Sequence, residues 1–242
     1  MVDLKKMSVA LVIVTLLLQA MLIASAYAMS PHKIERRLFV HYANSANAKV
    51  PQGGIGYYAL MSVQWDTATL PVKVEVNTAG SGLVAMSVIS AINTAAEEWD
   101  DGAYSGWGGV VPNLFEVSTV SVTTTFDWID PLMDGKNTIL WGNYPQAGVI
   151  AVTITWHDTS TNNILEFDMV FDTDFKWSTT GTRKTMDVQN IATHELGHAV
   201  GLADLYIPLA RKETMYGYST TGETTKRSLY TGDKTGITFL YP

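Results

Sequence analysis

The sequence predicts an α+β domain in which three helices pack on a twisted, mixed β-sheet of about five strands. Short segments rich in Val and Thr, bounded by Gly, Pro, Asn or Asp, are typical of strands. Other segments carry apolar residues at helical spacing. These segments follow the order strand, helix, several strands, helix, helix. With 47% hydrophobic residues among 242, the chain can form one large core.

The predicted domain begins with a strand and the upstream helix. From Pro71 onward, Val72, Val74 and Val76 alternate with polar residues, as in a strand with one buried face. Residues 83–99 contain no Gly or Pro and have apolar residues on one helical face. The residues on this face are Val84, Val88, Ala91, Ala95 and Trp99.

The remaining elements follow from the same two patterns. Four further strands are predicted, at residues 115–126, 138–141, 148–156 and 165–171. Two helices are predicted at residues 185–202 and 231–240. The predicted folded domain therefore spans residues 71–242. Residues 29–70 form a lead-in or a short pro-region, and the two histidines in that stretch, His32 and His41, receive no assignment.

The N-terminus has the pattern of an export signal. Lys5 and Lys6 precede a long apolar run that ends in small residues, with Ala26 and Ala28 as candidate cleavage positions. Residues 1–28 are therefore predicted to be a signal peptide, and the protein to be secreted or extracytoplasmic. The same run is long enough to span a bilayer, so an uncleaved membrane anchor is the alternative.

Charge and cysteine content exclude several classes of protein. The formal net charge is -7 and no cluster of Lys and Arg occurs, which argues against binding to a nucleic-acid backbone. The chain has no cysteine, so disulfides and thiolate metal sites are excluded. We expect a monomer.

The predicted helix at 185–202 carries a metal-binding pattern. His194 and His198 are four residues apart, so their side chains lie on the same face of the helix. Two imidazoles in this arrangement can bind one Zn²⁺ and leave a position open for chemistry. Glu195, next to the first histidine, is then placed to act as a general base.

A third ligand is predicted shortly after this helix. Gly201 can end the helix and turn the chain sharply, because glycine enters left-handed conformations without a clash. Asp204 follows three residues later, and its carboxylate can bind zinc. The alternative for Asp204 is a carboxylate that only hydrogen-bonds the backbone of its own turn.

The extended pattern His-Glu-x-x-His-x-x-Gly-x-x-Asp resembles the metzincin metallopeptidases, and within them the matrixin-like and snapalysin-like proteins. The usual third ligand is His, whereas snapalysin-type enzymes have Asp, as here at Asp204. The resemblance further implies that Met215 forms the tight turn beneath the metal and that Tyr218 can approach the developing oxyanion. It covers about residues 71–242.

This resemblance implies a metzincin-type zincin domain with one catalytic zinc ion and peptide or protein substrates. The substrate would pair in extended form with an edge strand, which we expect at residues 148–156. A membrane would be a partner only if the N-terminal segment stays uncleaved. The competing function is a non-catalytic, zinc-binding surface or scaffold protein, and the presence of Glu195 argues against it.

Calcium is a second candidate cofactor. Asp168, Asp172 and Asp174 resemble the acidic positions of a matrixin strand, and carboxylate oxygens suit Ca²⁺. Val170 replaces the histidine that binds a second zinc ion in that strand, so only one zinc ion is expected. The alternative for the three aspartates is a solvated strand end.

Overall fold

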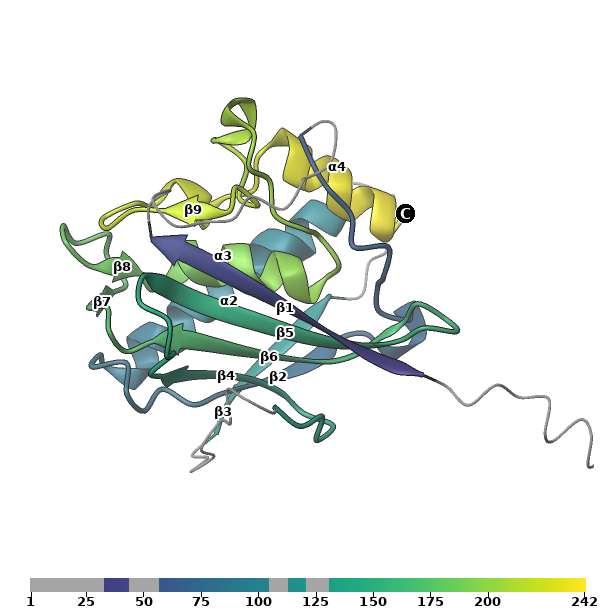
Figure 1. Cartoon of the computed structure of the whole chain (residues 1–242), viewed down its shortest axis with the longest axis horizontal. Coiled ribbons are helices and arrows are strands. Elements are labelled where there is room, and N and C mark those ends of the chain that lie inside the picture. Colours follow the sequence, from purple (N-terminus) through teal and green to yellow (C-terminus); the bar gives the residue numbers. More distant parts are fainter. Residues whose placement is uncertain (1–32, 44–56, 105–112, 121–130) are drawn as a thin grey trace, which may run out of the picture. The chain divides into compact units, whose positions relative to one another are not determined.

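The computed structural model describes residues 33–43, 57–104, 113–120 and 131–242 (Figure 1). Residues 34–242 belong to one compact unit. The predicted signal peptide lies outside the described residues. Within the described ranges, no helix is both long and apolar enough to cross a membrane.

A seven-stranded mixed sheet is the main scaffold of the described residues. Its strand order is β3-β2-β4-β6-β5-β1-β9. The strands are β1 (Ile34–Ala43), β2 (Val72–Val76), β3 (Phe115–Thr119), β4 (Asn137–Gly142), β5 (Val149–Asp158), β6 (Ile164–Asp172) and β9 (Tyr218–Ser219). β2, β3, β4 and β6 run parallel, while β5 is antiparallel to both β6 and β1. Two short strands, β7 (Trp177–Ser178) and β8 (Met186–Asp187), form a separate pair.

Three α-helices pack on one side of this sheet (Figure 1). They are α2 (Ala85–Tyr104), α3 (Val188–Ala199) and α4 (Thr231–Leu240), and three 3₁₀ turns lie at η1 (Thr67–Thr69), η2 (Pro208–Ala210) and η3 (Thr225–Arg227). The predicted α+β class, the five strands and the three helices are confirmed. The strand predicted at 115–126 ends at Thr119, and residues 121–130 lie outside the described ranges.

Two parts of the predicted lead-in belong to the folded unit. β1 adds a full strand to the sheet. Met61, Val63 and Trp65 are buried in the core, and the indole N–H of Trp65 donates to the carbonyl of Ala199 at 2.8 Å. The compact unit therefore starts at Ile34, well before the boundary at residue 71 that the sequence patterns suggested.

The prediction that residues 148–156 form an edge strand is wrong. β5 pairs with β6 on one side and with β1 on the other. The sequence pattern of β5 does not indicate this second partner. A strand with both faces buried has the same hydrophobic pattern whether its hydrogen-bonding edge is free or paired. All ten residues of β5 are buried.

Helix α3 is held rigidly at both ends. At its start, Asp187 accepts a hydrogen bond from the backbone N–H of Asn190 and pairs with the guanidinium of Arg227 at 2.6 Å. At its end, Gly201 has a φ of +105°, and a Cβ there would lie 2.2 Å from the carbonyl oxygen of Val63. Only glycine fits this turn, which directs the chain back toward the helix.

Candidate active site

The two histidines of α3 are oriented by backbone carbonyls. Nδ1 of His194 donates to the carbonyl of Thr214 at 2.7 Å, and Nδ1 of His198 donates to that of Leu202 at 2.9 Å. This hydrogen-bond pattern assigns the lone pair to Nε2 in both rings. Carbonyl groups that hold the second nitrogen in this way are typical of metal-binding histidines.

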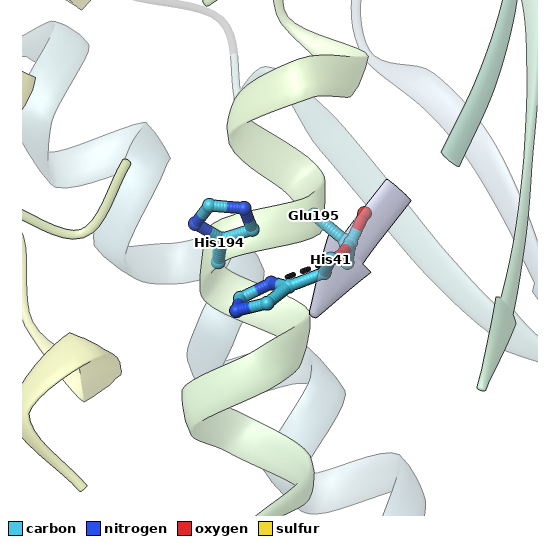
Figure 2. Close-up of side chains that lie close together, drawn as sticks. All are labelled: His41, His194 and Glu195. Atoms are coloured by element: carbon cyan, nitrogen blue, oxygen red, sulfur yellow. Dashed lines mark hydrogen bonds and ion pairs between the residues drawn. The ribbon is translucent and has the colours of Figure 1, made fainter. Parts of the chain in front are cut away.

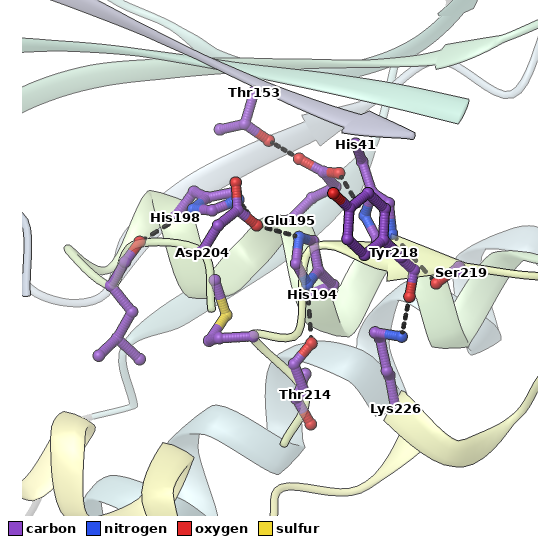
Figure 3. A network of polar contacts seen from close by, with 12 residues as sticks. His41, Thr153, His194, Glu195, His198, Asp204, Thr214, Tyr218, Ser219 and Lys226 are labelled. Carbon is purple, nitrogen blue, oxygen red and sulfur yellow. Dashed lines mark hydrogen bonds and ion pairs between the residues drawn. The ribbon is translucent and has the colours of Figure 1, made fainter. Parts of the chain in front are cut away.

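Asp204 closes a three-residue group with these rings (Figure 3). Its Oδ1 lies 3.2 Å from Nε2 of His194 and 3.5 Å from Nε2 of His198. Its other oxygen accepts a hydrogen bond from the hydroxyl of Tyr206 at 2.9 Å. The turn at Gly201 thus brings the predicted third ligand to the first two.

The donor set fits a zinc ion. Ligand atoms 2.0–2.1 Å from a tetrahedral ion are about 3.3 Å apart, which matches the two measured separations to Oδ1 of Asp204. Among the described residues, His194 Nε2 and Asp204 Oδ1 are both buried without a hydrogen-bond partner. Two buried polar atoms left in this way need a ligand between them, and a cation satisfies both.

The protonation states agree with this fit. Burial, followed by the neighbouring His41, lowers the pKa of His194 to about 4, so its ring is neutral and available as a ligand. Burial alone would raise the pKa of Asp204, but His198 and His194 hold this pKa well below its usual range. The neutral ring of His194 and the ionised carboxylate of Asp204 are in the forms that bind metal. Burial lowers the pKa of His198 but Asp204 raises it overall, so this ring gives up its proton when a metal binds.

Glu195, next to His194 on α3, is buried and is held by two side chains. Its Oε2 accepts a hydrogen bond from the hydroxyl of Thr153 on β5 at 2.5 Å. Its Oε1 lies 3.2 Å from Nδ1 of His41 on β1. Burial raises the pKa of Glu195, while its histidine neighbours and the hydroxyl of Thr153 act against that shift.

Sequence reasoning missed His41. This residue is 1% exposed, and its ring lies 4.0 Å from the ring of His194 (Figure 2). The β-forming residues around it, Leu-Phe-Val-His-Tyr, are a strand signal that could have been found. Nothing local to the sequence indicates that this strand reaches Glu195.

His41, His194 and Glu195 form a second group that could hold an ion among the described residues. Both nitrogens of His41 are already engaged, Nδ1 with Glu195 and Nε2 with the hydroxyl of Ser219 at 3.0 Å. In the group containing Asp204, by contrast, the inward atoms of His194 and Asp204 have no hydrogen-bond partner among the described residues. The group His194, His198 and Asp204 is therefore the better metal centre.

Met215, which the resemblance assigns to the turn beneath the metal, packs against α3 at Gly197. It is buried, and a Cβ on Gly197 of α3 would lie 2.2 Å from its sulfur. The turn containing Met215 is anchored by Asp233, whose carboxylate accepts the backbone N–H groups of Thr214 at 2.6 Å and of Met215 at 3.1 Å. Asp233, which the sequence did not single out, thereby fixes the carbonyl that orients His194.

Tyr218 lies on β9 beside Tyr206, with ring centroids 5.3 Å apart. Its pKa is raised by burial first, then by Tyr216 and by the carboxylate of Asp204. The role of Tyr218 at the oxyanion stays a prediction from the resemblance.

The structure does not support the predicted calcium site. The oxygens of Asp168 and Asp172 accept the backbone N–H groups of Thr138 and Asp174, respectively. Neither candidate metal group found among the described residues contains Asp168, Asp172 or Asp174. Asp168 and Asp172 lie four positions apart on β6. Asp168 bonds the neighbouring strand β4, and Asp172 bonds the turn that follows β6.

Residues 147–242 match the family model described as Matrixin, a family of metallopeptidases. This range contains β5, β6, α3 and α4, together with His194, His198, Glu195 and Asp204. No curated protein matches the chain. The family match, the fold and the geometry around α3 agree, and residues 147–242 are similar to the matrixin family of metzincins.

Proposed function

We propose that the protein is a zinc-dependent endopeptidase in which His194, His198 and Asp204 bind the metal and Glu195 is the general base. The observation that carries this proposal is the spacing of the three inward ligand atoms, which suits one tetrahedral zinc ion. The metallopeptidase family of residues 147–242 supports the same reaction class.

When bound, zinc supplies Lewis-acid polarisation of the scissile carbonyl and makes water a stronger nucleophile. The carboxylate of Glu195 takes a proton from the attacking water and passes it to the leaving nitrogen. Thr153 holds this carboxylate in place through its hydroxyl. In this proposal the hydroxyl of Tyr218 donates a hydrogen bond to the developing oxyanion.

Peptide or protein segments in extended form are the proposed substrates. An extended chain could pair with the backbone of β5 only where β1 leaves that edge of the strand. The export pattern of residues 1–28 supports a site of action outside the cytoplasm. A zinc-binding protein without turnover is the alternative that the experiments must exclude.

Removal of zinc tests the proposal directly. We expect one zinc ion per chain by metal analysis. A chelator should abolish cleavage of a mixed peptide library, followed by mass spectrometry, and added zinc should restore it. Because hydrolysis by the full chain can be slow, the assay uses high protein concentrations and long incubation. One bound zinc ion together with no cleavage of any library peptide, both by the natural chain and by Phe39→Ala/His41→Ala, would favour the non-catalytic alternative.

Thr153→Val should move the pH dependence of hydrolysis. The hydroxyl of Thr153 lowers the pKa of Glu195, so its loss raises that pKa. Glu195 must be ionised to act as a base, and the acidic limb of kcat/KM should shift to higher pH. A hydrogen bond to a charged group contributes about 1.5–3 kcal/mol, which corresponds to a shift of about one to two pH units.

Thr155→Val is the matched control for this shift. Thr155 lies two residues further along β5, is equally buried, and has a hydroxyl without a partner among the described residues. Its replacement should leave the pH profile unchanged. Equal shifts for both variants would show that Thr153 acts through packing rather than through Glu195.

A further inference from the structure

Strand β1 fills the groove beside the metal centre. It pairs antiparallel with β5 from Ile34 opposite Asp158 to Tyr42 opposite Val149. At its far end, Tyr42 and Ala43 also pair with the parallel strand β9. β1 therefore runs between β5 and β9 and directly across α3 (Figure 1).

The inward side chains of β1 cover the metal-binding rings. The ring of Phe39 stacks on that of His198, with centroids 4.2 Å apart and planes 15° apart. The ring of His41 lies against that of His194 at 4.0 Å. A register shift occurs between His41 and Tyr42, at the point where the imidazole enters the site.

His41 also engages the proposed catalytic base. One of its nitrogens lies 3.2 Å from Oε1 of Glu195, and the other 3.0 Å from the hydroxyl of Ser219 on β9 (Figure 3). Since Thr153 holds Oε2, both carboxylate oxygens of Glu195 have protein partners. A water molecule that is to be activated has to displace the contact with His41.

A substrate and β1 cannot occupy this groove together. An extended substrate would pair with one hydrogen-bonding edge of β5. β1 occupies this same edge along nine register pairs. The chain contains no cysteine, so none of its own thiolates can block the metal. β1 covers the site with two aromatic rings and a strand pairing instead.

We propose that β1 is the chain's own ligand for the peptide-binding groove between β5 and β9, and that it keeps the peptidase latent until it leaves. This inference rests on the proposed function. The groove accepts an extended segment with rings at alternate positions, as Phe39 and His41 provide.

The first experiment measures the groove without relying on catalysis. Phe39→Ala/His41→Ala and the control Leu38→Ala are both made in the full chain carrying Glu195→Gln, which prevents self-cleavage. Leu38 directly precedes Phe39 on β1 but is 51% exposed. Amide hydrogen exchange is then followed for residues 149–158, with α2 as a check on the fold.

In the double variant we expect faster hydrogen exchange at the β5 amides that face β1. In Leu38→Ala these amides should exchange at the same rate as in the parent chain. The double variant should also gain binding of a fluorescent peptide with the sequence of residues 34–43. Unchanged exchange in β5 together with no peptide binding, while α2 stays protected, would overturn the proposal.

The second experiment measures activity with Glu195 intact. Because apparent activity is reduced by the fraction of molecules with a closed groove, the double variant should cleave library peptides about tenfold faster or more. Lower activity would overturn the proposal, since it would make His41 a support of catalysis. Open exchange and peptide binding without any hydrolysis would contradict the proposed peptidase function and still support the occupancy of the groove by β1.

Discussion

Glu195→Gln is expected to lower kcat/KM for peptide hydrolysis by about 10²–10⁴-fold, the usual contribution of a positioned general base. Gln has nearly the same shape and can still accept the hydrogen bond from Thr153, but it cannot take a proton from water. The zinc content should stay at one ion per chain, because the ligands are other residues.

The measurement compares initial rates in the natural chain and in the Phe39→Ala/His41→Ala variant, so that a closed groove does not hide the effect. Glu116→Gln is the matched control. Glu116 is an exposed glutamate on β3, away from α3, and its replacement should not change the rate. Undiminished hydrolysis by Glu195→Gln would exclude the proposed mechanism.

Asp204→Ala is expected to have the second large effect, on zinc binding itself. Partners outside the ligand set contribute about 10–100-fold to metal affinity, and the loss of a direct ligand should exceed that range. The variant also leaves Nε2 of His194 and of His198 without the carboxylate that now lies 3.2 and 3.5 Å away. Hydrolysis should fall together with zinc content.

Zinc affinity is measured by competition with a coloured chelator, which does not depend on activity. Tyr206→Phe provides the comparison, since it removes only the hydrogen bond to the outer oxygen of Asp204. Its effect on affinity should be within about 10–100-fold. An Asp204→Ala protein that binds zinc as tightly as the natural chain would show that Asp204 is not a ligand.

Local features of the sequence predicted much of the fold and the metal centre. The interval between His194 and His198 is set by the pitch of one helix, and a glycine is required for the turn that returns Asp204. The strands and helices from residue 72 onward also follow from short-range periodicity, and the structure confirms them within a few residues. These features are predictable because each depends on residues that are close together in the sequence.

Only the tertiary structure decided what surrounds Glu195. Thr153 and His41 come from different strands, 42 and 154 positions away in the sequence, and meet at one carboxylate. Local sequence patterns also cannot predict that β1 pairs with β5. Strands pair through backbone hydrogen bonds, and the side-chain periodicity of a strand does not identify its partner. The sequence by itself therefore determined the proposed metal ligands, which lie on one helix and its following turn. Long-range strand pairing determined which groups hold the base and what fills the groove.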